Sequence, residues 1–220
     1  MNGKIMINFA CVYYKNKKTI YTEEYIDKLY NGIKRNYRYP FKFTCLSNVE
    51  TKYDTIKLEN NWEGWWSKIE LFRPNIFTDP VFYIDLDVII CQNIDSIIDK
   101  LDPNNFYMIR SVTPDSGNAN SSIMSWSGDY SSIYQEFLQN TDHIKSMYRK
   151  GNLIGDQAYI QSQIKSKLRY IDKDFDNVIS WNHWKYPDKN NKTSKFYIFC
   201  GSEKKPHLEK ENSIVEKFWI

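Results

Sequence analysis

The chain contains few cysteine, glycine and histidine residues and no long hydrophobic run. Of its 220 residues, 4 are Cys, 8 are Gly and 3 are His. The cysteines are far apart, each in or beside an apolar run, which fits neither a zinc site nor a redox motif and favours buried free thiols. No apolar run approaches the roughly 18 residues needed to span a bilayer, and residues 1–14 show no signal-peptide pattern. We therefore expect a cytoplasmic protein without a transmembrane segment.

A large excess of one charge is also absent. The 30 Lys and Arg residues against 27 Asp and Glu residues give a formal net charge of +3. This near balance argues against nucleic acid or an anionic membrane surface as a partner, because both select extended cationic surfaces. Aromatic residues, in contrast, make up 16% of the chain. Most of them should pack in the core, although their flat faces also stack on sugars and bases.

The order of apolar segments predicts an α/β fold in one domain. Residues 4–14 are almost continuously apolar and rich in β-favouring types, which is typical of a strand buried on both faces. Apolar residues at helical spacing over 25–33 predict a helix, with Thr22 as its cap, and 41–46 is predicted to form the next strand. Such a βαβ unit indicates a doubly wound sheet that binds ligands beyond the carboxyl ends of its strands.

The rest of the chain continues this alternation. Ser67 and Glu70 match a capping box, so a helix should begin there and end before Pro74. Further elements are predicted in the order strand 81–84, which runs on through Asp85–Asp87 into 88–90, helix 94–101, strand 106–110, strand 121–126, helices 131–138 and 156–164, and strands 168–171, 178–181 and 196–200. The polar tail, 208–220, should be less ordered. No repeat or linker divides the chain.

Two carboxylates in an apolar segment are the strongest chemical signal. Asp85 and Asp87 lie within residues 81–90, where a desolvated, unpaired carboxylate costs several kcal/mol. On extended backbone, residues two apart point to the same side, so both carboxylates could bind one divalent cation. Carboxylate oxygens suit Mn²⁺ or Mg²⁺, which commonly bridge carboxylates to substrate phosphates. The alternative is an ordinary turn at a strand end, where Asp is common.

Several short motifs accompany this pair, and together they resemble the GT-A glycosyltransferases, which transfer a sugar from a nucleotide-sugar donor. The most similar group contains glycogenin and the bacterial lipopolysaccharide galactosyltransferases. The matching segments are Trp65–Phe72, Phe82–Val88, Asn120–Met124, Gly155–Gln157, Phe199–Gly201 and Lys205–His207. They occur in the family's order and at its approximate spacing across nearly the whole chain, so the ordered set is more specific than any one motif.

The resemblance implies one Rossmann-like GT-A domain with a mixed, mostly parallel central sheet flanked by helices. A nucleotide-binding half would cover about residues 1–110 and an acceptor side about residues 111–207. Asp85 and Asp87, the family's Asp-x-Asp motif, would hold Mn²⁺ or Mg²⁺ against the donor's diphosphate.

The end of the first strand would line the base and ribose pocket. The resemblance places Ala10, Val12 and Tyr14 there. A strand end is a ligand-binding position on physical grounds as well, and Tyr13 or Tyr14 could either stack on a base or simply pack.

Four further residues are implied near the donor sugar. Lys68 resembles the family's basic residue beside the donor phosphates or sugar, although a solvated lysine in a helix's first turn is equally ordinary. Asp156 and Gln157 match an Asp-Gln pair that faces donor sugar and acceptor in the resembling enzymes, so they are the catalytic candidates. Asp156 also stands at a predicted helix start, where a carboxylate is a common cap. Asn120 is a candidate partner for a sugar hydroxyl.

The third metal ligand is ambiguous, because the sequence departs from the family's pattern near its end. Relatives have a histidine near the glycine that corresponds to Gly201, where this chain has Cys200. His207 is the preferred candidate, since neutral imidazole binds Mn²⁺. Cys200 is the weaker candidate, because soft sulfur matches that metal poorly. Lys204 and Lys205 could contact the diphosphate or simply be solvated.

We therefore predict a metal-dependent transferase that moves a hexose from a nucleotide diphosphate sugar, with a UDP-sugar as the favoured donor, to a hydroxyl of a glycan or other acceptor. Asp115 and Asp156 are both available as the base, so stereochemistry is open, with retention favoured by the resemblance alone. A nucleotidyltransferase would want a glycine-rich loop after the first strand, and residues 11–18 contain no glycine. The main alternative is a noncatalytic carbohydrate- or nucleotide-sugar-binding module, which does not explain the paired carboxylates.

Overall fold

The computed structural model describes residues 6–113, 116–149, 155–183, 194–201, 204–209 and 211–220. Its centre is a sheet with the strand order β3-β2-β1-β4-β7-β6-β8. β7 is antiparallel to both of its neighbours, and the other neighbouring pairs are parallel. The sheet is thus mixed and mostly parallel, which confirms the predicted fold class. Its strands are β1 (Ile7–Tyr13), β2 (Phe41–Ser47), β3 (Asp54–Lys57), β4 (Val81–Ile84), β6 (Phe106–Arg110), β7 (Ala119–Trp126) and β8 (Leu168–Tyr170).

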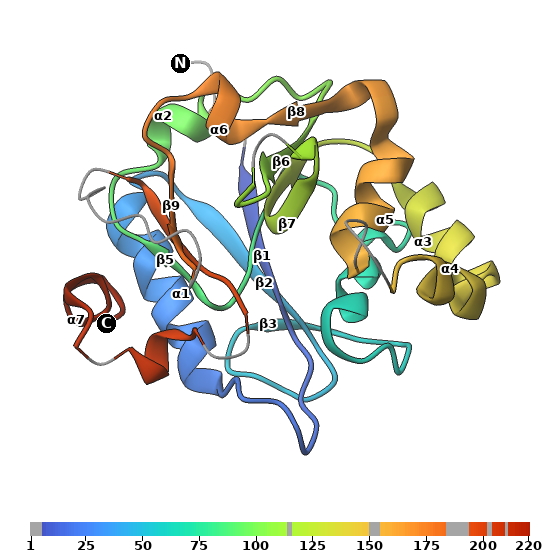
Figure 1. Cartoon of the computed structure of the whole chain (residues 1–220), viewed down its shortest axis with the longest axis horizontal. Helices are drawn as coiled ribbons and strands as arrows, with labels where there is room; N and C mark the ends of the chain where they lie inside the picture. The colour runs from blue at the N-terminus through green and yellow to red at the C-terminus, as the bar shows by residue number, and fades with distance from the viewer. Residues whose placement is uncertain (1–5, 114–115, 150–154, 184–193, 202–203, 210) are drawn as a thin grey trace.

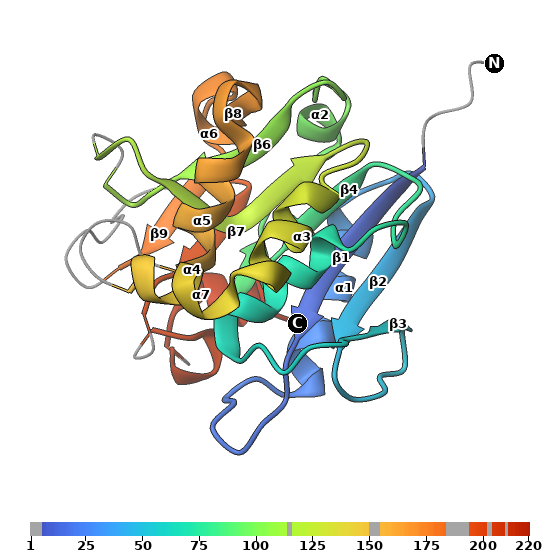
Figure 2. The same cartoon turned by 90° about the vertical axis from the view of Figure 1, so that its right-hand side faces the viewer.

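Helices cover both faces of this sheet (Figures 1 and 2). On one face lies α1 (Glu23–Asn36), next to a smaller sheet of order β5-β10-β9. The strands of the smaller sheet are β5 (Val88–Ile90), β9 (Ile179–Asn182) and β10 (Phe196–Phe199). On the other face lie the 3₁₀ helix η1 (Gly64–Phe72) and the helices α3 (Ser131–Gln139) and α5 (Gly155–Ile164). The central strands therefore have an apolar layer on each side.

The first strand shows why the chain forms such a sheet. Phe9, Cys11 and Tyr13 belong to the core on the α1 side, whereas Ala10, between them, belongs to the core on the opposite side. Successive residues of a strand point to opposite faces, so a strand between two helical layers must be apolar at nearly every position. The prediction of a doubly buried strand is confirmed over the described residues, which begin at Met6.

The cysteines contribute to these cores as free thiols. Cys11, Cys45 and Cys91 are buried, and Cys200 is partly buried. Cys11 and Cys45 are register partners on the adjacent strands β1 and β2. This agrees with the expectation of unpaired cysteines in apolar surroundings.

Short elements complete the fold. They are α2 (Asp95–Ile98), α4 (Thr141–Met147), η3 (Lys165–Lys167), α6 (Ile171–Asp174), η4 (Pro206–Leu208) and α7 (Ser213–Phe218). β3, α4, η3, α6, η4 and α7 are not among the elements predicted from the sequence. In the part of the chain that the structure describes, every helix is too short or too polar to cross a bilayer.

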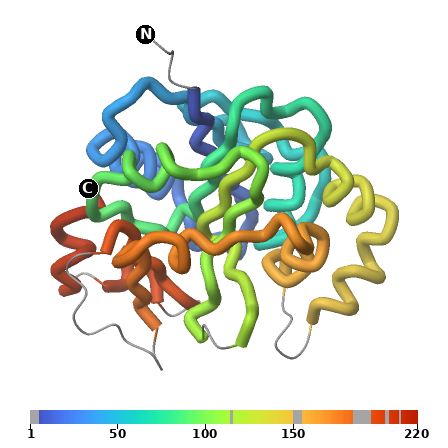
Figure 3. Tube along the Cα trace, turned by 90° about the horizontal axis from the view of Figure 1, so that it is seen from above, coloured from blue at the N-terminus to red at the C-terminus, as the bar shows by residue number. Residues whose placement is uncertain are grey.

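The chain end differs from the expectation of a poorly ordered tail. α7 forms within residues 211–220 and lies on the same side of the molecule as α1 (Figures 1 and 3). Val215 is buried, and the ring of Trp219 lies 5.0 Å from the ring of Tyr25 in an edge-to-face contact. The guanidinium of Arg35 donates to the carbonyl of Phe218 at 2.7 Å. The tail is polar overall, but its Val215 is buried and its Trp219 packs against α1, and this packing holds the tail in place.

The capping box predicted at Ser67 and Glu70 is wrong. Ser67 lies inside η1 and donates to the carbonyl of Gly64 at 2.7 Å. Glu70 is fully buried, and its carboxylate accepts hydrogen bonds from the backbone N–H groups of Glu59 at 2.7 Å and Asn60 at 2.8 Å. The carboxylate of Glu70 accepts hydrogen bonds from two amide groups of the preceding loop, so it does not cap the helix start. A contact from outside the helix thus overrides the local sequence pattern.

This buried carboxylate yields the first prediction. Glu70→Ala leaves two amide groups without an acceptor and Arg73, 3.6 Å from Glu70, with one less carboxylate. We expect it to lower the free energy of unfolding by about 3 kcal/mol in urea denaturation. Glu24→Ala removes an exposed carboxylate and should cost less than about 0.5 kcal/mol. Equal effects of the two substitutions would contradict the assigned role of Glu70.

Candidate functional site

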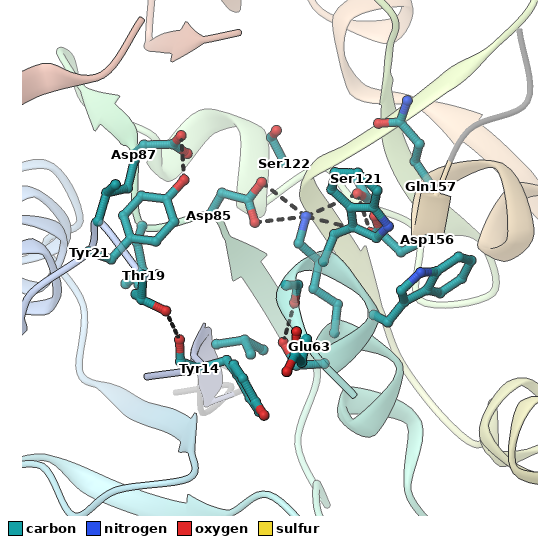
Figure 4. Close-up of a pocket in the computed structure, with 18 of the residues that line it drawn as sticks. Tyr14, Thr19, Tyr21, Glu63, Asp85, Asp87, Ser121, Ser122, Asp156 and Gln157 are labelled. Carbon is teal, nitrogen blue, oxygen red and sulfur yellow. Dashed lines mark hydrogen bonds and ion pairs between the residues drawn. The ribbon is translucent and has the colours of Figure 1, made fainter. Parts of the chain in front are cut away.

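A cavity of about 670 Å³ opens at the carboxyl ends of β1 and β4 (Figure 4). β1 contributes Val12 to its wall, followed by Tyr14, and β4 is followed by Asp85 and Asp87. Residues of η1, β7 and the first turn of α5 also line the cavity. The cavity therefore occupies the edge of the sheet where parallel strands of an α/β fold expose free backbone groups and bind ligands.

The floor of this cavity is an ion-pair cluster around Lys68. Its ammonium lies 2.9 and 3.0 Å from the two carboxylate oxygens of Asp85 and 3.5 Å from Oδ2 of Asp156. It also lies 3.1 Å from the hydroxyl of Ser121, which itself donates to Asp156 at 2.6 Å. These four residues come from η1, the end of β4, β7 and α5, and Figure 4 shows three of them, Asp85, Ser121 and Asp156, with their dashed contacts.

Burial changes the ionisation of this cluster. Burial alone would lower the pKa of Lys68, but the carboxylates of Asp156 and Asp85 outweigh burial, so the pKa lies above the ordinary lysine value. The pKa of Asp156 is raised by burial, and Lys68 and Ser121 oppose that rise. Lys68 is thus a permanent cation at neutral pH. Its side chain is only 12% exposed, so it is not the solvated lysine considered as an alternative.

Asp85 and Asp87 lie on a turn rather than on one extended strand. The N–H of Val88 bonds to the carbonyl of Asp85 at 3.2 Å, and this turn carries the chain from β4 in the large sheet to β5 in the small one. The geometric argument from strand alternation is therefore wrong, and the turn that we considered as the alternative is the local structure. Both carboxylates nevertheless face the same cavity (Figure 4).

Each of the two carboxylates has a tyrosine and a lysine as partners. The hydroxyl of Tyr83 donates to Asp85, which is also paired with Lys68. Oδ2 of Asp87 accepts from the hydroxyl of Tyr21 at 3.0 Å and from the ammonium of Lys205. Asp87 and Lys205 are both buried. The charges that seemed costly in an apolar segment are thus compensated by side chains of the protein itself.

Most of the predicted site residues line this cavity. They are Val12, Tyr14, Lys68, Asp85, Asp87, Asn120, Asp156, Gln157, Cys200 and Lys205. Ala10 is 1% exposed, belongs to the core between the sheet and η1, and does not line the cavity. Tyr13 also packs in a core, so of Tyr13 and Tyr14 only Tyr14 lines the cavity. Asp115 lies outside the described residues.

The chain does not bring His207 to the two carboxylates. Its Nδ1 is hydrogen-bonded to the hydroxyl of Tyr25, and it does not line the cavity. Cys200 does line the cavity, but burial, with a smaller effect of Asp87, raises the pKa of its thiol to about 12. Within the described residues there is no group of three or more His, Cys, Asp or Glu side chains placed to hold a metal ion.

The structure adds site residues that the sequence analysis did not single out. Tyr83 stands two positions before Asp85, so strand alternation could have placed it on the same face. Ser121 lies in a motif that was quoted, but nothing in the motif indicates that it links Lys68 to Asp156. Tyr21 is 66 residues from Asp87 in sequence, and no local pattern connects them.

Comparisons with known proteins identify the fold. No protein-family profile and no curated protein sequence matches the chain. The glycosyltransferase GlyE of Streptococcus pneumoniae TIGR4 aligns with a TM-score of 0.65 at 14% identity, over 92% of this chain and 56% of GlyE. The galactosyltransferase LgtC, solved with donor and acceptor sugar analogues, aligns with a TM-score of 0.59 at 10% identity over 96% of each chain.

A third solved structure has the same arrangement. Mouse xyloside xylosyltransferase 1 aligns with a TM-score of 0.54 at 10% identity, over 88% of this chain and 97% of that one. The chain therefore has the GT-A fold of the glycosyltransferases. It spans about half of GlyE but nearly the whole of LgtC.

The Lys68 cluster yields the second prediction. Lys68→Met leaves the buried Asp156 and the partly buried Asp85 without their shared cation, and we expect the free energy of unfolding to fall by about 3–5 kcal/mol. Adding Asp156→Asn should restore part of this loss, because it removes one of the two uncompensated charges. Urea unfolding of the two single variants and the double variant gives the coupling energy. Strictly additive losses would show that Lys68 and Asp156 do not interact.

Proposed function

We propose that this protein is a metal-dependent glycosyltransferase that moves a hexose from a UDP-sugar to a hydroxyl of a glycan or other acceptor. The observation that carries the proposal is the pair Asp85 and Asp87 beside Lys205, at the strand ends of a glycosyltransferase fold and in a cavity of about 670 Å³. Cavities of about 300–1,000 Å³ are typical of small-molecule and cofactor sites.

The base and ribose would bind where β1 ends. Val12, Tyr14 and Ile20 form an apolar wall there, and Ile20 is 44% exposed although it lines the cavity. The loop between Tyr14 and Tyr21 is held by the hydroxyl of Thr19, which donates to the carbonyl of Tyr14 at 2.8 Å. A flat base could stack against the Tyr14 ring while this loop keeps its position.

The diphosphate would lie over Asp85, Asp87 and Lys205. Two carboxylates that supply hard oxygen ligands to one cavity fit Mn²⁺ or Mg²⁺, with open positions for phosphate oxygens. When bound, the cation supplies Lewis-acid stabilisation of the charge on the departing diphosphate. The ammonium of Lys205 supplies a further positive charge beside the same leaving group. Of the two candidates for a third protein ligand, Cys200 lines the cavity, whereas His207 would have to leave the hydroxyl of Tyr25 to reach the cation.

The donor sugar would lie between the Lys68 cluster and α5. Lys68 is held by Asp85 and Asp156, so its ammonium has a fixed position beside the sugar. Asn120 and Gln157 line the same region, and within the described residues the amide of Gln157 has no hydrogen-bond partner. Amide groups of this kind pair with sugar hydroxyls. Asp156, bonded to Ser121 and Lys68, would orient these groups rather than act freely as a base.

A noncatalytic sugar-binding or nucleotide-sugar-binding module is the second candidate. It is favoured by the lysines, which neutralise Asp85 and Asp87 without a metal. Such a module would bind the ligand and never release free sugar or UDP. Turnover therefore separates the two functions.

Donor turnover in metal and in chelator provides the third prediction. With UDP and Mn²⁺ at about 100 times their dissociation constants, native stability should rise by roughly 2.7 kcal/mol in thermal unfolding, and EDTA should remove the rise. UDP-glucose, UDP-galactose and UDP-N-acetylglucosamine should then be assayed for hydrolysis with Mn²⁺.

Asp87→Asn should abolish both the stability shift and hydrolysis, because it removes one of the two carboxylates proposed to hold the cation. Asp79→Asn, a substitution at a surface ion pair with Lys42, is the matched control and should retain both. Full metal-dependent turnover in Asp87→Asn would exclude the proposed metal site. Nucleotide binding without turnover of any donor would favour the binding module.

The pairing of Lys205 with Asp87 yields the fourth prediction. In the free protein the ammonium occupies Oδ2 of Asp87, so it competes with a cation there. We expect Lys205→Met to tighten Mn²⁺ binding about tenfold in the absence of nucleotide and to weaken it when UDP is present, because the diphosphate then lacks its lysine. Titration of free Mn²⁺ by electron paramagnetic resonance measures both affinities.

Lys204→Met is the control for this experiment. Its ammonium pairs with Glu209 at 2.8 Å, away from the carboxylates, and its removal should change neither affinity by more than about twofold. Weaker Mn²⁺ binding by Lys205→Met without nucleotide would show that Lys205 does not compete with the metal.

A further inference from the structure

Two of the described tryptophans, Trp65 and Trp66, line the cavity. Trp65 is the exposed one of the two, at 54%. Trp62 is buried at 7%, and the ring of Trp66 stacks on Phe137 with centroids 5.1 Å apart. The other exposed large apolar residues in the described chain are aliphatic: Met6, Ile20, Leu138, Met147, Leu208 and Ile220. An exposed indole that lines a cavity is a flat apolar surface that a ligand in the cavity can cover.

The position of this indole is fixed by Gly155, the first residue of α5. A Cβ atom at Gly155 would lie 3.1 Å from Nε1 of Trp65 and 3.3 Å from two of its ring carbons. Gly155 also has φ of +75°, which a residue with a side chain adopts only with strain. The glycine thus permits both the turn into α5 and the close approach of the ring. The Trp65 ring therefore packs closely against the backbone of Gly155, which restricts the positions that the ring can adopt.

The groups next to this surface are polar. Asp156 and Gln157 follow Gly155 directly, and Figure 4 shows both on the same side of the cavity. A flat apolar ring beside amide and carboxylate groups matches a hexopyranose, which has an apolar C–H face and a rim of hydroxyl groups. Glu63, which is exposed and lines the same cavity, disfavours an acidic sugar by charge repulsion.

We propose that Trp65 is the platform on which a neutral terminal hexose of the acceptor stacks. This inference rests on the proposed function, in which the base lies at the end of β1 and the diphosphate lies over Asp85 and Asp87. Those positions leave the solvent-facing side of the cavity, beside Gly155 and Gln157, for the acceptor. The acceptor is thus a neutral glycan rather than a peptide or a charged sugar, and Trp65 determines that specificity.

The test measures sugar binding and nucleotide binding separately. Saturation-transfer difference NMR with methyl β-galactoside, methyl α-glucoside, lactose and glucuronic acid is recorded on wild type with UDP and Mn²⁺. We expect at least one neutral sugar to bind and glucuronic acid not to bind. Trp65→Ala should weaken the neutral sugar at least tenfold while its affinity for UDP with Mn²⁺ changes less than twofold, and Trp65→Phe should retain part of the sugar binding.

Trp62→Phe is the matched control, because that ring is buried, packs on Phe137 with centroids 4.7 Å apart and does not line the cavity, so its replacement should affect stability rather than sugar binding. Unchanged sugar binding in Trp65→Ala would overturn the platform, as would a wild type that binds none of the neutral sugars. A loss of UDP affinity equal to the loss of sugar affinity would assign Trp65 to the donor side and also overturn it. Sugar binding that depends on Trp65 in a protein that turns over no nucleotide sugar would refute the transferase while leaving the platform intact.

Discussion

The site depends on one interaction, the contact of the Lys68 ammonium with Asp85 and Asp156. It joins segments that are remote in sequence, because Lys68 comes from η1, Asp85 from the end of β4 and Asp156 from α5. With Asp87 and Lys205 included, three carboxylates face two ammonium groups when all are ionised. One negative charge is then left over among these five side chains. Under the proposed function, this residual charge would favour an added cation even though each carboxylate already has a lysine partner.

The sequence predicted the parts of the fold that depend on local patterns. β1 and β4 are apolar at almost every position because helices cover both faces of the sheet, and this pattern requires no knowledge of distant residues. The carboxylates after β4 were found for the same reason, since charge in an apolar run is conspicuous. The turn that holds Asp85 and Asp87 was only the alternative to a continuous strand, because an Asp-Leu-Asp segment is compatible with both.

The partners of these carboxylates could not be predicted in the same way. Tyr21 and Lys205 lie 66 and 118 residues from Asp87, and only the folded chain brings them together. Glu70 is a second case in which the sequence did not reveal the partners of a carboxylate. Its spacing from Ser67 matched a local helix cap, yet it binds amide groups of the preceding loop. The sequence shows which residues carry charge, but burial and residues distant in the sequence determine which groups those charges contact.

The scarcity of glycine explains why side chains dominate this site. A glycine-rich loop neutralises phosphate with backbone N–H groups, but residues 11–18, which follow the centre of β1, contain no glycine. Under the proposed function, a diphosphate bound here would be neutralised by Lys205 and by a cation held at Asp85 and Asp87. Lys205 also forms an ion pair with Asp87. One buried ammonium would thus be the partner of a carboxylate without the donor and of phosphate with it, so that the fold would tolerate buried charge in both cases.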